Sequence, residues 1–186
     1  QYIGATNLGA NDSGRAALYW TRDAKNELVL ETITEKELKD TSLDENGIAN
    51  TEWLMCSQRT NHACLLDPYL DEAISPPKLL TSITAPILSQ SKLIGIAGLD
   101  IELDHLQQLV QNMDQRMFAG AGTVFLISQR GIVAATTQSN LKIGSQLQQQ
   151  APKLQQEILP LLKSKRPQTQ WHGDTLRSVM PIQMQG

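Results

Sequence analysis

The chain has 186 residues, of which 40% are hydrophobic and 19% are charged, and its formal net charge is −3. This length suits one globular domain or two small ones, each with a hydrophobic core. The small negative charge argues against binding to a phosphate backbone, so we expect no nucleic-acid partner. No run of 18 apolar residues occurs, so no segment is predicted to span a bilayer. The chain begins at Gln1 without a signal-peptide pattern, and we expect it to be a fragment of a longer protein.

The first 50 residues predict a hairpin followed by a short helix. Strand candidates at residues 17–21 and 28–33 flank a polar turn. Thr34 followed by Glu37 is typical of a capped helix start. Residues 40–50 are polar and are expected to form a surface loop.

Two longer strands and a helix are predicted in the middle of the chain. The strands cover residues 78–88 and 92–99, and the first has the alternation of a half-buried antiparallel strand. Apolar residues then recur at helical spacing over residues 101–117. Asp100 stands directly before this helix, so capping of the helix is one interpretation of this residue.

The last third predicts a further small sheet and a helix. Strand candidates at 123–128 and 132–136 are joined by a tight turn. Residues 146–163 have an amphipathic helical pattern, whose apolar side consists of Leu147, Leu154, Ile158 and Leu162. Residues 169–180 have the pattern of a final hairpin with its turn at 172–174. The predicted fold class is therefore α+β, with two small antiparallel sheets joined by a helix.

The two cysteines allow three interpretations. A disulfide between Cys56 and Cys64 would close a short loop and stabilise the fold by about 2–3 kcal/mol. Such a bridge persists in an oxidising compartment. The second interpretation is a pair of free thiols, and the third is a metal site formed with His62, although structural zinc needs four ligands and no second cysteine pair exists. The disulfide is the interpretation we favour, and we expect no bound metal.

The chain carries no recognisable catalytic motif. Its histidines, His62, His105 and His172, lie far apart and not at metal-ligand spacing. Neither the nucleophile elbow nor the phosphate-binding loop pattern occurs. We therefore expect a protein that is not an enzyme and that needs no cofactor.

Aromatic and acidic residues at predicted strand and loop ends suggest a small-molecule pocket. Aromatic faces attract cations, and a carboxylate forms a charge-assisted hydrogen bond with an ammonium group. The candidate ligand-binding residues are Trp53, Tyr69, Asp71 and Asp100, together with Tyr19 in the first predicted strand. Four of them also have a purely structural interpretation: Trp53 as core, Tyr69 as a turn anchor after Pro68, Asp71 as a solvated loop residue and Asp100 as the helix cap.

A series of motifs follows a specific order along residues 14–136. They are Gly14-Arg15, Tyr19-Trp20-Thr21-Arg22, Trp53, Asp67-Pro68-Tyr69, and the segments 80–87, 94–103 and 125–134. This series resembles the double Cache (dCache) sensor domains of bacterial transmembrane receptors, in particular chemotaxis receptors of the methyl-accepting type.

The resemblance implies two modules, each built on a PAS-like antiparallel sheet. Residues 1–117 would form the membrane-distal, ligand-binding module, without the long N-terminal helix of the family. Residues 118–186 would form an incomplete membrane-proximal module. The resemblance also implies the periplasmic portion of an inner-membrane protein, which agrees with a Cys56–Cys64 bridge, and leaves homodimerisation of the full receptor open.

The resemblance also implies a ligand class. Family members that bind amino acids carry an Arg two residues before the Trp for the ligand carboxylate, a Tyr directly after the Trp, and an Asp at the end of the later strand for the ammonium group. Trp53 and Asp100 match this pattern, but Thr51 and Leu54 replace the Arg and the Tyr. A cationic amine without a carboxylate, such as a biogenic amine or polyamine, is therefore expected first and an amino acid second.

The expected function is ligand sensing with a signal passed across the membrane. The output could instead belong to a histidine kinase or a diguanylate cyclase, since the resemblance concerns the sensor alone. Two hypotheses from different classes of protein are a periplasmic interaction domain without a small ligand and a hydrolase with an unrecognised site.

Overall fold

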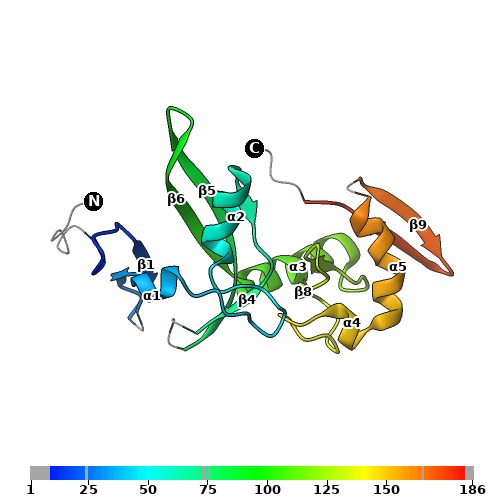
Figure 1. Cartoon of the computed structure of the whole chain (residues 1–186). Coiled ribbons are helices and arrows are strands. Elements are labelled where there is room, and N and C mark those ends of the chain that lie inside the picture. The colour runs from blue at the N-terminus through cyan, green and yellow to red at the C-terminus, as the bar shows by residue number, and fades with distance from the viewer. Residues whose placement is uncertain (1–8, 24, 73, 75, 165, 183–186) are drawn as a thin grey trace. The chain divides into compact units, whose positions relative to one another are not determined.

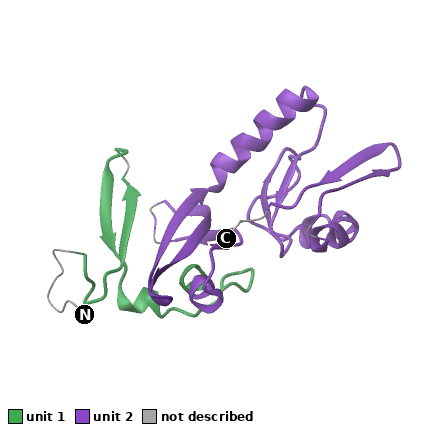
Figure 2. Ribbon diagram, turned by 90° about the horizontal axis from the view of Figure 1, so that it is seen from above, with its two compact units in different colours: residues 1–54 green, residues 55–186 purple. Residues whose placement is uncertain are grey.

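The computed structural model describes residues 9–23, 25–72, 74, 76–164 and 166–182. The strands in this part of the chain form one four-stranded and three two-stranded sheets, all antiparallel, and helices complete the fold (Figure 1). This confirms the α+β class. The chain divides into two compact units, residues 1–54 and 55–186 (Figure 2). The module boundary predicted at 117/118 remains a prediction.

Unit 1 contains the predicted hairpin and capped helix. Strands β1 (Leu18–Arg22) and β2 (Leu28–Thr32) pair antiparallel. Helix α1 (Glu35–Leu38) begins with a capping box. The Thr34 hydroxyl accepts from the Glu37 backbone N–H at 3.2 Å, and the Glu37 carboxylate accepts from the Thr34 N–H at 2.7 Å. The two reciprocal bonds satisfy backbone donors that the short helix cannot satisfy internally.

Helix α2 (Glu52–Thr60) was not predicted from the sequence. Its Glu, Leu, Met, Gln and Arg residues favour a helix, whereas its Trp, Cys, Ser and Thr residues have only modest helix propensity, so the local sequence does not decide its structure. Tertiary links hold its second half: the Ser57 hydroxyl is buried and lies 2.9 Å from the hydroxyl of Thr84. The helix is thus stabilised by what it packs against as well as by its own sequence.

Strand β5 (Lys78–Ser89) is the centre of the four-stranded sheet. It pairs with β3 (Cys64–Leu65), β4 (Tyr69–Asp71) and β6 (Lys92–Glu102). Figure 1 shows β5 and β6 as a long hairpin with α2 alongside. Its turn residues Gln90 and Ser91 have φ of 49° and 62°, which matches a tight turn between twisted strands.

Strand β6 runs further than predicted and corrects the interpretation of Asp100 as a helix cap. Asp100 lies inside the strand, paired with Ser82, and the ladder continues to the pair Leu80–Glu102. Helix α3 (Leu103–Phe118) begins only after Glu102, which occupies the N-cap position without a side-chain capping bond. Pairing with β5 holds the backbone extended for two residues beyond Asp100, so the capping interpretation was wrong.

The remainder of unit 2 follows the predicted order. Its elements are β7 (Phe125–Ile127), β8 (Val133–Thr136), α4 (Leu147–Gln150), α5 (Pro152–Lys163), β9 (Gln168–His172) and β10 (Thr175–Val179). The single helix predicted at 146–163 is divided at Ala151 because Pro152 disfavours helical backbone at the residue before it and itself suits the first helical turn.

The predicted apolar side of this helical segment forms a core. Leu147 and Ile158 are buried with Val133 and Leu141. Leu154 and Leu162, on the same predicted side, pack against this cluster. The helical periodicity of residues 146–163 therefore identified the buried face correctly, although not the break.

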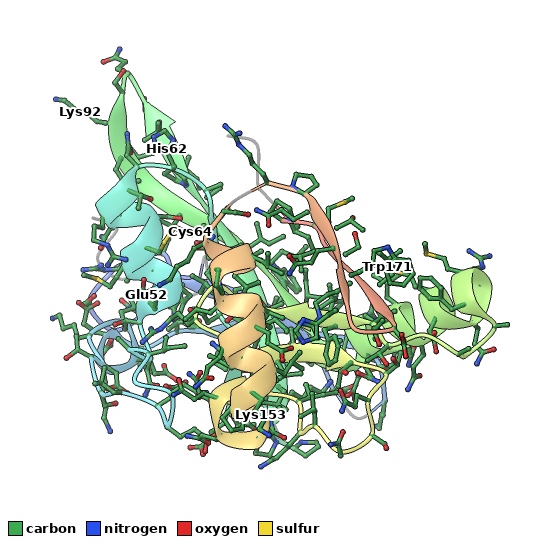
Figure 3. The ribbon with its side chains drawn as sticks, turned by 90° about the vertical axis from the view of Figure 1, so that its right-hand side faces the viewer. Glu52, His62, Cys64, Lys92, Lys153 and Trp171 are labelled. Carbon is green, nitrogen blue, oxygen red and sulfur yellow. A yellow bond between two sulfur atoms is a disulfide. The ribbon has the colours of Figure 1, made fainter. Side chains whose placement is uncertain are left out.

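Cys56 and Cys64 are joined by a disulfide in the structure, which is the first of the three interpretations. The two Cα atoms are 6.2 Å apart. Cys64, labelled in Figure 3, begins β3, whereas Cys56 lies on α2. The described residues include no cluster of three or more His, Cys, Asp or Glu side chains suited to a metal ion. The bridge therefore fastens α2 to the sheet.

Reduction of this bridge is expected to lower the melting temperature. Opening the loop should cost about 2–3 kcal/mol of unfolding free energy, or roughly 4–12 °C for a chain of this size. Calorimetry with and without dithiothreitol measures the shift. The double variant Cys56→Ser, Cys64→Ser is the control and should melt identically in both conditions. An unchanged melting curve of the reduced wild type, with both thiols titrated, would contradict the stabilising role.

Candidate functional site

One face of the four-stranded sheet gathers three of the predicted site residues. Residues paired directly across antiparallel strands point to the same face, as do alternate residues along a strand. Asp100 pairs with Ser82 on β5. Tyr69 and Asp71 pair with Leu80 and Lys78, alternate positions of the same strand. Tyr69, Asp71 and Asp100 therefore share one face.

A chain of hydrogen bonds connects Tyr69 with Asp100 through Ser82. The Tyr69 hydroxyl lies 2.8 Å from Ser82 Oγ, and Ser82 Oγ donates to Asp100 Oδ1 at 2.6 Å. Because the Ser82 hydroxyl has one hydrogen and donates it to the carboxylate, Tyr69 is the donor in the other bond. Ser82 is only 1% exposed. The sequence analysis did not single out Ser82, since only the register of β5 with β4 and β6 gives it this position.

The electrostatics of this face favour a neutral phenol. Burial raises the pKa of Tyr69 well above its ordinary value, and the negative charges of Asp100 and Asp71 raise it further. Lys78 Nζ lies 2.5 Å from Glu102 Oε1 on the same face. The ammonium group of Lys78 is therefore paired with the carboxylate of Glu102.

Helix α2 packs on this same face of the sheet. Thr84, which bonds Ser57, is two residues beyond Ser82 on β5. Cys64 pairs directly with Thr84 and carries the disulfide to α2. A hydrogen bond and a disulfide thus hold α2 to two paired residues of the sheet, Thr84 and Cys64.

Trp53 and Tyr19 belong to unit 1, whereas the residues of the sheet face belong to unit 2. Trp53 is on the first turn of α2 and half-buried, one turn before Ser57 in the helix. Tyr19 is half-buried in β1. Their place in a common site with Tyr69 and Asp100 remains a prediction.

One face of the four-stranded sheet thus carries a half-buried tyrosine and acidic side chains, and helix α2 is fastened over the same face. Among the described residues no helix is both long and apolar enough to cross a membrane.

The chain belongs to the family of methyl-accepting chemotaxis protein-like first PDC sensor domains, whose model matches residues 1–108. It is 33% identical over 182 residues to the methyl-accepting chemotaxis protein TlpQ of Pseudomonas aeruginosa, a match that covers 98% of this chain and 26% of TlpQ. It is 32% identical over 89 residues to the methyl-accepting chemotaxis protein PscA of Pseudomonas syringae pv. tomato, which covers 48% of this chain and 13% of PscA. The chain thus spans about a quarter or less of the length of these relatives.

A solved structure shares this fold. The structure of methyl-accepting chemotaxis protein X superposes with a TM-score of 0.65 and 22% identity, over 94% of this chain and 60% of that one. The predicted sensor-domain family and its fold are therefore confirmed.

The raised pKa of Tyr69 predicts a loss of stability at alkaline pH. Folded Tyr69 keeps its proton while the unfolded residue ionises near pH 10, so its contribution is fully present below that pH and is lost above it. Above pH 10 the free energy of unfolding should fall up to about 1.4 kcal/mol more per pH unit in the wild type than in Tyr69→Phe. Denaturant titrations between pH 9 and 11 measure both slopes. Equal slopes would show that Tyr69 ionises normally in the folded protein.

Proposed function

We propose that this chain is the periplasmic ligand-binding sensor domain of a membrane-anchored chemotaxis receptor, and that its ligand is a small cationic amine. The observation that carries the proposal is the arrangement of Tyr69, Asp71 and Asp100 on one sheet face, with Asp100 oriented by Ser82. The family supplies the sensing role. The disulfide suits an oxidising compartment such as the periplasm.

The charges on this face support an amine over a carboxylate. Among the described residues that pair on this face, Asp71, Asp100 and Glu102 carry carboxylates and Lys78 carries an ammonium group. A ligand carboxylate would meet repulsion here, whereas an ammonium group gains charge-assisted hydrogen bonds. Thr51, at the position where amino-acid-binding members carry Arg, is uncharged and buried. Biogenic amines and polyamines are thus favoured, and amino acids come second.

The signalling output is the second part of the proposal. The same kind of sensor could precede a histidine kinase or a diguanylate cyclase, but both curated relatives are chemotaxis proteins, which supports the receptor. The domain itself has a sensing rather than an enzymatic role in this proposal.

A thermal-shift screen of amines, polyamines, amino acids and dicarboxylates tests the ligand class. We expect a saturable rise in melting temperature with amines, with dissociation constants then measured by calorimetry. A rise with dicarboxylates alone would overturn the amine proposal and keep the sensor. A flat screen would favour the interaction domain.

Replacement of Asp100 by Asn should weaken amine binding. Losing the ionic hydrogen bond is expected to cost more than about 1.5 kcal/mol, which is roughly a tenfold or greater rise in the dissociation constant. Calorimetry with the best amine of the screen measures the change. Asp104→Asn makes the same chemical change at an exposed position of α3 and should leave affinity unaltered. Unchanged affinity in Asp100→Asn would remove Asp100 from the site.

A further inference from the structure

We propose that Ser82 is a positioning residue that makes this site selective for ligands that donate hydrogen bonds. The inference rests on the proposed amine-binding function and names the residue that sets its specificity. Ser82 is 1% exposed, so it is expected to act through Tyr69 and Asp100 rather than by touching the ligand.

In the hydrogen-bonded chain of Tyr69, Ser82 and Asp100, each hydroxyl hydrogen has a defined acceptor. The Ser82 hydroxyl gives its hydrogen to Asp100 Oδ1, at 2.6 Å. Its oxygen accepts the hydrogen of Tyr69, at 2.8 Å. The phenol is kept protonated by burial and by the neighbouring carboxylates, which raise its pKa. Both hydroxyl hydrogens therefore point along this chain of hydrogen bonds, from Tyr69 to Ser82 and from Ser82 to Asp100.

This direction leaves acceptors for a ligand. The phenol oxygen keeps a lone pair, and the Asp100 carboxylate has acceptor capacity beyond the Oδ1 contact. An ammonium group, which offers only donors, matches both. A ligand carboxylate or carbonyl oxygen would find neither the Tyr69 nor the Ser82 hydroxyl hydrogen available. Such a ligand is therefore disfavoured by hydrogen bonding as well as by charge.

Removal of the Ser82 hydroxyl should weaken this selectivity. In Ser82→Ala the Tyr69 hydroxyl loses its acceptor, so its hydrogen becomes available to Asp100 or to an incoming acceptor. Ser82→Thr retains a hydroxyl on a side chain that strands accommodate well, and should restore the arrangement.

The test measures dissociation constants of the whole chain for two probes of matched length, 1,4-diaminobutane and butanedioate. Ser82→Ala is expected to bind the diamine at least tenfold more weakly and to lower the preference for it over butanedioate. Ser82→Thr should stay within about threefold of the wild type. Thr81→Val is the matched control. Thr81 directly precedes Ser82 in β5 and lies on the opposite face of the sheet, where its hydroxyl donates to the Leu66 carbonyl at 2.7 Å. The Thr81→Val variant should lower stability and keep the preference.

A measurement without ligand separates this inference from the proposed function. In the wild type the Tyr69 hydroxyl proton should give a resolved NMR signal with a cross-peak to the Ser82 β-protons. Ser82→Ala should change the pKa of the phenol, since Tyr69 loses its hydrogen-bond partner. If the wild type binds neither probe, the proposed function and the selectivity inference fail together, while these two readouts still decide whether Ser82 orients Tyr69.

Two results would overturn the role of Ser82. The first is a Ser82→Ala variant that melts lower but keeps both its diamine affinity and its phenol pKa, which would make Ser82 a packing residue. The second, which applies even if Ser82→Ala does not fold, is a Tyr69 hydroxyl proton in the wild type without contact to Ser82.

Discussion

The pairing of β5 with its neighbours is the constraint on which the site depends. β5 pairs with β3, β4 and β6, so its register decides which side chains of all four strands share a face. A shift of one residue would turn Ser82 to the opposite face and place Thr81 beside Tyr69 and Asp100. The buried side chains of β5 include Thr81, Ser82 and Thr84 besides Leu80, so hydroxyl groups that must be satisfied occupy much of this interior. Their hydrogen bonds therefore stabilise the observed register of β5.

Attachment of α2 to the same sheet gives this constraint a second element. Ser57 on α2 forms a hydrogen bond with Thr84, and the disulfide links α2 to Cys64, the strand partner of Thr84. Helix α2 is thereby held on this face of the sheet at two points.

Much of the fold followed from local patterns. The hairpin of β1 and β2, the Thr34 capping box, the two long strands and the apolar side of α4 and α5 each depend on neighbours within a few residues, and each was found. Asp100 was identified as a candidate acid but was also assigned a capping role, which was wrong because β5 extends β6 by long-range pairing. Helix α2 was missed for the related reason that the contacts stabilising it come from residues distant in sequence.

The sequence by itself determined the residue types of the candidate site, an aromatic and acidic set without an arginine two residues before Trp53, and the pair of cysteines available for a bridge. The tertiary structure alone decided that Tyr69, Asp71 and Asp100 share a face, and that a buried serine lies between the phenol and the carboxylate. The reason is physical. Periodicity and capping are local properties of the chain, whereas the direction of a hydroxyl hydrogen depends on which acceptor strand register brings within about 3 Å.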